Sequence, residues 1–228
     1  MIIRIPLLVA CLTLGATSMS GVASGGEGPS VKITPSLESI TVKHQGREVT
    51  IQRNQDKEAT ISAAYAKTSR PCPPFCIQPA SVAPGVETVA ELEVLGYLKR
   101  VSEGDDTVLV VDSRTPDWQA HGSIPGSVNI PWTRINVDMA GAWDVAAEAD
   151  SLGDVLEHSF GARRTADGWD FSAARTLVLF CNGLWCAQSS INVKTLLKAG
   201  YPASKLKWYR GGMQAWESVG LTTTRDLR

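Results

Sequence analysis

Two pairs of closely spaced cysteines are the residues of this chain whose types and spacing could do chemistry. Cys181 and Cys186 lie in the stretch 180–189, and Cys72 and Cys76 lie further upstream in a proline-rich stretch. A thiolate is a strong nucleophile, and two neighbouring thiols can form a disulfide or supply half of a metal site. Cysteine is also a common core residue, so packing is the alternative at each position.

The residues around Cys181 predict a strand, a tight loop and a helix. Residues 176–180 are apolar and β-branched, and residues 187–199 have a helix-forming composition closed by Gly200. Cys181 would then lie at the carboxyl end of a buried strand, facing loop amides and the amino end of a helix, which both stabilise an anion. We therefore expect a pKa below about 8.5, the free-cysteine value. A reactive thiolate, a packing residue and a structural disulfide with Cys186 all remain open at this point.

The second cysteine pair lies in residues 70–79, Arg-Pro-Cys-Pro-Pro-Phe-Cys-Ile-Gln-Pro. The prolines exclude a regular helix or a central strand. Cys72 and Cys76 could be a redox pair, half a zinc site, or a staple in an extended segment that covers the main domain, and we favour the staple. A zinc site would need two more ligands, and the three histidines stand at no recognisable ligand spacing. We therefore expect no metal.

Length and composition fit one ordinary domain with an appendage, or two small domains. The chain has 228 residues, of which 43% are hydrophobic and 20% charged, with a net charge of −1. With so little net charge, no global field favours nucleic acid or an anionic membrane. We expect no nucleic-acid partner.

Residues 1–24 are predicted to be a secretory signal peptide. Arg4 precedes an apolar run from Ile5 to Leu14, and small residues follow up to a cleavage site expected near Ala23 or Ser24. The run is too short to span a bilayer, which needs about 20 apolar residues. We expect an exported, periplasmic protein with no stable membrane span after cleavage. We do not expect lipidation at Cys11, because the apolar run before it is only a handful of residues long.

Residues 25–84 are predicted to form an N-terminal extension, and residues 85–228 the main domain. In the extension, apolar and polar residues alternate on either side of Gln45-Gly46-Arg47, which predicts a β-hairpin that packs on the main domain. The main domain is expected to open with a helix whose capping box is Thr88 and Glu91. No internal repeat is visible.

The main domain contains further all-apolar or short strands. The run 107–111 is apolar throughout, as in strands of parallel sheets that are covered on both faces. Asp112 follows it, and we expect a structural role there, as a helix cap or a hydrogen-bonding partner that orders a loop. Residues 119–132 are expected to form a turn-rich bridge into a short strand, and another short strand is expected at 205–209, before a last helix that starts near Arg210. The interval 133–174 is interpreted as an enlarged connection with one helix, 145–158, and no chemistry of its own.

Several motifs, taken in order, match one family. They are Asp112-Ser113-Arg114, Gly122 to Ser127 with Asn129-Ile130-Pro131, the strand and loop of Cys181, Gly200-Tyr201-Pro202, and Tyr209 to Trp216. Over about residues 86 to 221 the chain therefore resembles the rhodanese-like superfamily. The resemblance implies an α/β fold, with a three-layer α/β/α domain and a central parallel sheet of about five strands, here preceded by the hairpin-containing extension.

The resemblance also implies an activity and a set of site residues. Rhodanese-like sulfurtransferases move sulfane sulfur from a small sulfur donor to a thiol acceptor through a persulfide on the first loop cysteine, here Cys181, with no metal or organic cofactor. The loop amides 182–186 would stabilise the anion. The implied substrate-binding residues are Asn182, Gly183, Leu184, Trp185 and Arg114.

Two loop positions depart from the family pattern. Leu184 stands where the family commonly has glycine, and Cys186 where it often has arginine, so an anion clamp for thiosulfate is missing. Trp185 offers an apolar wall to a larger or less charged sulfur donor. Ser123 stands where the familiar motif has histidine, and His121 is displaced to a position before the glycine.

Cys186 is the departure that opens alternatives. It could attack a persulfide or sulfenic acid on Cys181 and close an intraloop disulfide, so we expect both cysteines to be catalytic. An exported thiol-disulfide redox protein, served by a redox partner protein, is the second hypothesis. A noncatalytic binding module is the third, and in that case Cys186 would be a small filler under the following helix.

Overall fold

The computed structural model describes residues 29–136 and 151–227. The predicted signal peptide and residues 145–150 of the predicted connection helix lie outside these ranges. The strands are β1 (Ser39–His44), β2 (Arg47–Gln52), β3 (Glu87–Val89), β4 (Val108–Asp112), β5 (Val128–Asn129), β6 (Arg163–Thr165), β7 (Gly168–Asp170), β8 (Thr176–Phe180) and β9 (Leu206–Tyr209). The α-helices are α1 (Ala63–Ala66), α2 (Glu91–Ser102), α3 (Pro116–Ala120), α5 (Ser151–Asp154), α6 (Gln188–Lys198) and α7 (Gly212–Ser218).

The central sheet has five parallel strands in the order β3-β9-β8-β4-β5. This arrangement confirms the predicted fold class. β8 occupies the middle position, between β9 and β4, and four of its five residues are buried. A strand that is buried on both faces has no solvent-facing positions, which explains why its sequence is an unbroken apolar run.

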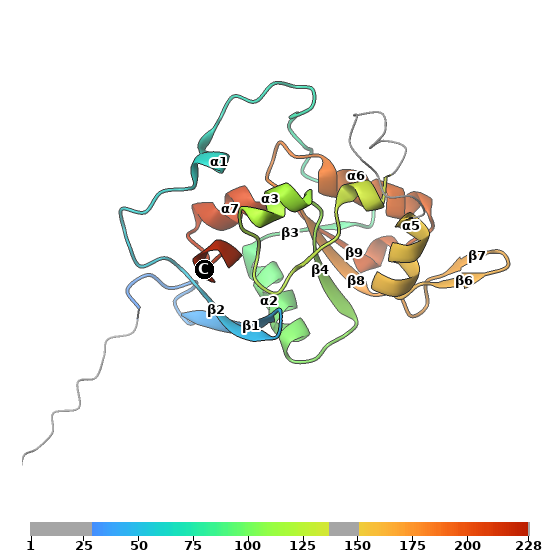
Figure 1. Ribbon diagram of the computed structural model, residues 1–228, viewed down its shortest axis with the longest axis horizontal. Helices are drawn as coiled ribbons and strands as arrows, with labels where there is room; N and C mark the ends of the chain where they lie inside the picture. Colours follow the sequence, from blue (N-terminus) through green and yellow to red (C-terminus); the bar gives the residue numbers. More distant parts are fainter. Residues whose placement is uncertain (1–28, 137–150, 228) are drawn as a thin grey trace, which may run out of the picture.

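Alternate residues of the central strands face two separate cores. Val178 and Phe180 pack with residues of α2, α7 and the β1–β2 hairpin, whereas Leu177 and Leu179 pack with α6 and the 155–160 segment. Figure 1 shows this three-layer arrangement, with α2, α7 and the hairpin on one side of the sheet and α5 and α6 on the other. The carboxyl ends of all five strands therefore open at one edge between two helical layers.

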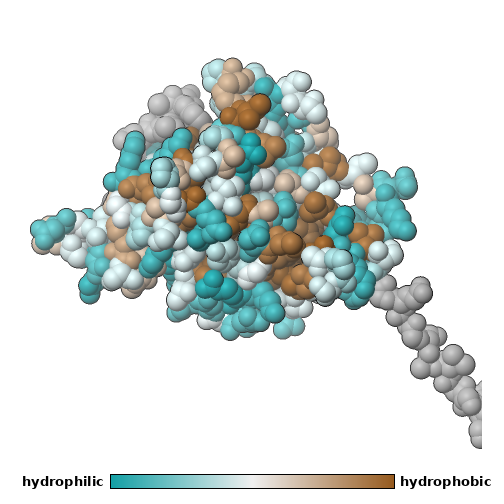
Figure 2. Space-filling model, turned by 180° about the vertical axis from the view of Figure 1, so that it is seen from behind, coloured by the Kyte–Doolittle hydropathy of each residue, from teal (hydrophilic) through white to brown (hydrophobic). Residues whose placement is uncertain are grey.

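The β1–β2 hairpin packs on α2, as predicted. Val42 and Ile51 are completely buried, and the amide of Lys43 donates to Ser102 Oγ at the end of α2. Between the hairpin and α2 lies a groove of about 780 Å³ with an apolar floor, and Figure 2 shows brown side chains over these elements on the back of the molecule. None of the residues that line this groove belongs to the Cys181 loop.

The extension then crosses the carboxyl edge of the sheet. In Figure 1 the teal segment that carries α1 arches over α7 and α3 before the chain returns to β3. Tyr65 of α1 is buried in the same core as α2 and α7. Within the described residues, no helix is long and apolar enough to cross a membrane.

Three local predictions were wrong or incomplete. Thr88 does not cap a helix, because Glu87–Val89 is edge strand β3 and helix α2 starts after Ala90, whose amide donates to Glu93 Oε2. The connection contains the hairpin β6–β7, which was not predicted. The described part of the connection helix changes from α-helix at Ser151–Asp154 to π-helix at Val155–Ser159.

Candidate active site

Cys181 lies at the carboxyl end of β8, in the middle of the sheet. The loop that follows reaches α6 at Gln188, so the strand-loop-helix prediction is confirmed. Cys181 and Cys186 are both free thiols, and their side chains are 3% and 5% exposed. The structure therefore contains no Cys181–Cys186 disulfide, and a reagent must enter the fold to reach either sulfur.

The first turn of α7 holds the loop in its shape. The amide of Met213 donates to the Cys181 carbonyl at 3.0 Å, and the amide of Gln214 donates to the Asn182 carbonyl at 2.9 Å. Gly212 allows this close approach, since it has a φ of +54° and a Cβ there would lie 2.3 Å from the Cys181 carbonyl oxygen. Gly183 is also closely packed, because a Cβ at that residue would lie 2.9 Å from Gln214 Cβ.

The sulfur of Cys181 is surrounded by hydrogen-bond donors. Ser189 Oγ, in the first turn of α6, donates to Cys181 Sγ at 3.2 Å, and Trp208 Nε1 donates in turn to Ser189 Oγ at 3.0 Å. Burial opposes ionisation, but hydrogen bonds from Cys186, from the Ser189 side chain and from the amides of Ser189 and Gly183 outweigh it and lower the pKa of Cys181 to about 7. A large fraction of Cys181 is therefore thiolate at neutral pH.

The groups that stabilise the Cys181 thiolate differ in part from the predicted loop amides 182–186. Gly183 contributes an amide as expected, but Ser189, outside the predicted range 182–186, contributes both an amide and a hydroxyl. The amide of Cys186 closes a turn instead, by donating to the Gly183 carbonyl at 2.9 Å. Groups of the loop and of the first turn of α6 therefore both stabilise the Cys181 thiolate.

Cys186 stays protonated when Cys181 ionises. Burial and the neighbouring Cys181 thiolate raise the pKa of Cys186 well above its ordinary value, because a second negative charge would be both desolvated and repelled. The Cys186 thiol donates to Gln188 Oε1 at 3.6 Å, and the Cys181 thiol, when protonated, donates to the Cys186 carbonyl at 3.2 Å. The two cysteines of the loop therefore shift each other's pKa in opposite directions.

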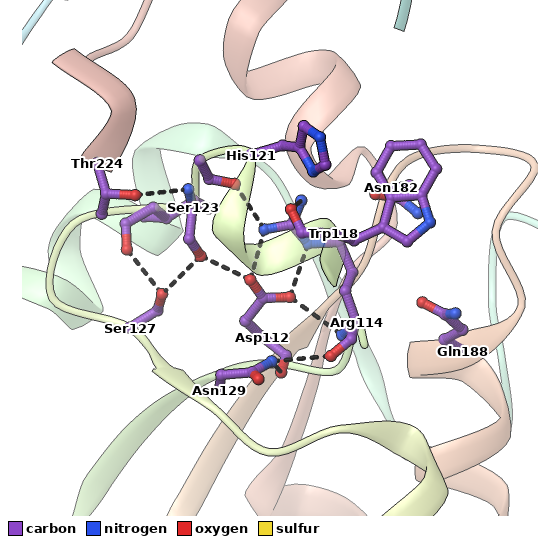
Figure 3. Close-up of polar contacts among 12 residues, drawn as sticks. Asp112, Arg114, Trp118, His121, Ser123, Ser127, Asn129, Asn182, Gln188 and Thr224 are labelled. Atoms are coloured by element: carbon purple, nitrogen blue, oxygen red, sulfur yellow. Dashed lines mark hydrogen bonds and ion pairs between the residues drawn. The ribbon is translucent and has the colours of Figure 1, made fainter. Parts of the chain in front are cut away.

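A buried ion pair between Asp112 and Arg114 lies beside the site. Asp112 and Arg114 are both 0% exposed, and the Arg114 Nη2 to Asp112 Oδ2 distance is 2.5 Å. Ser123, which stands at the family's histidine position, donates to Asp112 Oδ2 at 2.6 Å. Figure 3 shows this network, with Trp118, Asn182 and Gln188 to one side of the ion pair. The carboxylate orders the connection between β4 and β5, because Arg114 and Ser123 both donate to it.

Arg114 is implied by the family resemblance to bind substrate, but the structure gives its guanidinium other partners. Its five N–H groups are all used within the protein, by both oxygens of Asp112, the Tyr65 hydroxyl, and the carbonyls of Trp118 and Gly122. No N–H of the guanidinium is left for a substrate anion. The structure makes Arg114 part of the framework that holds these residues together.

Tyr65 connects the extension to the site. Its hydroxyl accepts from Arg114 Nη1 at 2.9 Å and donates to Asn182 Oδ1 at 3.3 Å, so the amide of the expected substrate-binding Asn182 is oriented by it. Burial raises the pKa of Tyr65 to about 12, and the hydroxyl remains a donor at neutral pH. Gln214 Nε2 also donates to the Tyr65 carbonyl.

The proline-rich segment lies against the Cys181 loop. Cys72 and Cys76 form a disulfide, as in the favoured staple interpretation. The amide of Gln78 donates to the Leu184 carbonyl at 2.8 Å, and the ring of Phe75 meets the ring of Trp185 edge-on with centroids 5.6 Å apart. Leu184 itself is 43% exposed. The segment therefore forms part of the wall around the loop.

A cavity of about 210 Å³ opens beside Cys186. It is lined by residues from the extension, from the segment after β4 with helix α3, from the segment after β5, and from the Cys181 loop with the start of α6, namely Pro74, Phe75, Thr115, Trp118, Trp132, Asn182, Trp185, Cys186, Ala187 and Gln188. Within residues 29–136 and 151–227, no cluster of three or more His, Cys, Asp and Glu side chains could hold a metal ion.

Sequence reasoning missed the site residues that come from other elements. Ser189 could have been found, because a side chain in the first turn of a helix points back towards the loop before it. Tyr65 and Phe75 carry no local signal, since they reach the site only through the path of the extension. Trp208 and Gly212 belong to stretches that the sequence marks as a strand and a helix start, without indicating which loop they touch.

Comparison with known proteins adds a family match. A family model described as the rhodanese-like domain matches residues 95–219. No curated protein matches the chain. Similar solved structures include the rhodanese-like domain of an Anabaena protein, at 19% identity over 62% of this chain and 79% of that chain with a TM-score of 0.36. The human single-domain sulfurtransferase matches at 19% identity over 58% of this chain and 96% of that chain, with a TM-score of 0.36. A protein of unknown function from Rhodopseudomonas palustris matches at 19% identity over 61% and 85%, with a TM-score of 0.39.

Proposed function

Because the chain belongs to the rhodanese-like domain family, we propose that it is a sulfurtransferase that carries sulfane sulfur as a persulfide on Cys181. The observation that carries the proposal is the environment of the Cys181 sulfur, where Ser189, Gly183 and Cys186 lower the pKa to about 7. A thiolate that forms at neutral pH is the nucleophile that sulfur transfer needs.

The reaction divides into two transfers. The Cys181 thiolate attacks the outer sulfur of a small sulfur donor, the sulfur-sulfur bond of the donor breaks, and the remainder of the donor leaves with the electron pair. A thiolate acceptor then attacks the outer sulfur of the persulfide and regenerates the Cys181 thiolate. The hydrogen-bond donors of the loop and of the start of α6 favour negative charge at this place, on the persulfide anion as on the thiolate.

Mass spectrometry of the loaded protein tests this proposal. Reduced protein treated with a panel of sulfur donors is expected to carry one additional sulfur atom on Cys181, located by tandem fragmentation of the peptide that contains both loop cysteines. Cys181→Ser is expected to carry none. An unmodified peptide after every sulfur donor would contradict the sulfurtransferase proposal.

The pairing of Cys181 with Cys186 favours a second candidate, a thiol-disulfide redox protein. The Cys186 sulfur can attack the inner sulfur of a Cys181 persulfide, which forms the intraloop disulfide and releases hydrosulfide without any external oxidant. A redox partner protein would then return the disulfide to two thiols. Cys186→Ser separates the candidates: a sulfurtransferase keeps sulfur loading and transfer in this variant, whereas a redox protein loses its disulfide exchange.

We also propose that the protein is exported to the periplasm. The order of one basic residue, an apolar run and small residues in residues 1–24 supports this. Fractionation of cells, with N-terminal sequencing of the mature protein, is expected to find a periplasmic chain that begins near residue 24. A cytoplasmic chain that retains residues 1–24 would contradict it.

A further inference from the structure

The cavity beside the cysteine loop is apolar and uncharged. Phe75, Trp118, Trp132 and Trp185 supply aromatic residues to its lining, which also includes the uncharged polar residues Thr115, Asn182 and Gln188. None of the described residues that line it carries a charge. Its volume of about 210 Å³ exceeds the roughly 150 Å³ that holds a benzene molecule in an engineered cavity. A phenyl-sized group therefore fits.

Arg114 and Arg70, two cations near the site, both make contacts within the protein. Arg114 spends its five N–H groups on internal partners, and Arg70 lies with its guanidinium carbon 3.8 Å from the Trp185 ring centroid, as in a cation-π pair. An inorganic donor such as thiosulfate carries two negative charges on a small volume and is costly to desolvate without a cation. The lining suits a sulfur donor whose bulk is apolar.

The outer wall of the cavity comes from the extension. Phe75 packs edge-on against Trp185, and the segment is fixed by the bond from Gln78 to Leu184, by Ser190 Oγ donating to Gln78 Oε1 at 2.9 Å, and by Arg210 Nη2 donating to the Gln78 carbonyl at 2.8 Å. Phe75 lies outside the residues 95–219 that the family model matches. This wall is therefore an addition of this chain to the family domain.

We propose that the cavity takes the apolar or aromatic substituent of an organic sulfane-sulfur donor and that Phe75 determines this preference. The inference rests on the proposed sulfurtransferase function. For a thiosulfonate, R–SO₂–S⁻, the Cys181 thiolate forms a bond to the outer sulfur while the bond between the two sulfur atoms breaks. The sulfinate R–SO₂⁻ leaves with the electron pair, so charge and atoms balance and no oxidant or reductant is needed.

Three sulfur donors with graded substituents test the inference on the full chain. Benzenethiosulfonate, methanethiosulfonate and thiosulfate are compared by kcat/KM for persulfide formation, and each value is divided by the rate of free cysteine thiolate with the same donor. We expect the normalised value for benzenethiosulfonate to exceed that for methanethiosulfonate at least about 10-fold, because buried apolar substituents discriminate by this much or more. Thiosulfate is expected to be the poorest of the three.

Substitutions of Phe75 test whether this residue causes the preference for benzenethiosulfonate. Phe75→Ala is expected to lower the benzenethiosulfonate value about 10-fold, with the methanethiosulfonate value within about twofold of wild type. Phe75→Leu, which keeps an apolar wall if the alanine variant folds poorly, is expected to fall between. Ile77→Ala is the matched control, since Ile77 lies on the same segment, is 85% exposed and does not line the cavity.

The outcomes separate this inference from the proposed function. Equal normalised values for the three donors, or equal losses in Phe75→Ala and Ile77→Ala, would overturn the cavity assignment while sulfur loading on Cys181 stands. Calorimetry with benzenesulfinate and methanesulfinate on Cys181→Ser protein tests the cavity without turnover. Benzenesulfinate that binds more tightly than methanesulfinate, by an amount that depends on Phe75, would support the cavity assignment. If in addition no donor loads sulfur on Cys181, the sulfurtransferase proposal is overturned and the cavity assignment stands.

Discussion

Replacing Ser189 by alanine tests the origin of the Cys181 reactivity. The Ser189 hydroxyl is 1% exposed, and it donates to Cys181 Sγ at 3.2 Å. A hydrogen bond to a charged group contributes about 1.5–3 kcal/mol. Since one pKa unit corresponds to about 1.36 kcal/mol, loss of this bond should raise the Cys181 pKa from about 7 by roughly one to two units.

The sign of the change follows from the charge state that the bond favours. Ser189 stabilises the thiolate, so its loss favours the thiol and moves ionisation to higher pH. At pH 7 the thiolate fraction should fall from about one half to roughly 1–10%, and alkylation by iodoacetamide should slow by roughly 5- to 50-fold. At a pH above both pKa values the two proteins should react at the same rate.

The assay is the pH profile of Cys181 alkylation, with the modified residue identified by tandem mass spectrometry. Ser190→Ala is the matched control, because Ser190 donates to Gln78 and to the Ala187 carbonyl and not to Cys181. Ser189→Ala also leaves Trp208 Nε1 without its acceptor, so the folded fraction is measured in parallel. A midpoint shifted by less than about 0.3 unit, or an equal shift in Ser190→Ala, would refute the role of Ser189.

Three further predictions concern the frame around the loop. Gly212→Ala should lower the free energy of unfolding by about 1–3 kcal/mol and abolish sulfur loading, because the new Cβ would meet the Cys181 carbonyl. In the control Gly96→Ala the new Cβ has nothing within 4 Å, so that variant should be neutral or stabilising. Equal melting temperatures of the two variants would contradict this prediction. Asp112→Asn should cost about 3–5 kcal/mol in urea unfolding, because it leaves the buried Arg114 charge uncompensated, and a loss below about 1 kcal/mol would show that the pair is dispensable. Tyr65→Phe should cost about 1–3 kcal/mol and slow sulfur loading, since Arg114 and Asn182 lose a shared partner; unchanged loading kinetics would show that the extension does not orient the loop.

Local sequence patterns predicted the elements whose environment is uniform along their length. Strand 176–180 was predicted to the residue, because every position from Leu177 to Phe180 is apolar and buried. β3 was missed, because it is a three-residue edge strand with two exposed positions and Thr88 and Glu91 imitate a capping box. The hairpin β6–β7 has exposed or half-exposed residues throughout and therefore shows no apolar alternation.

The candidate site could be predicted only as far as it is local. Cys181, Cys186 and the shape of their loop follow from one stretch of sequence, and the structure adds which groups surround the sulfur. Arg114 illustrates the limit, since an arginine after a strand suits both an anion site and a buried ion pair, and the choice depends on distant Tyr65 and Gly122. The role of such a residue depends on tertiary packing, which local sequence patterns do not report.

The pairing of β3 with β9 has a consequence for when the thiol becomes reactive. The first and the last strand of the central sheet are neighbours, with Thr88 opposite Trp208. Trp208, which donates to Ser189, and Gly212 to Gln214, which clamp the loop, are all synthesised after Cys181. A partly synthesised chain therefore carries a cysteine of ordinary acidity, with a pKa of about 8.5 and little thiolate at neutral pH. The low pKa of Cys181 therefore arises only when the sheet closes and brings Trp208 and the start of α7 to the loop.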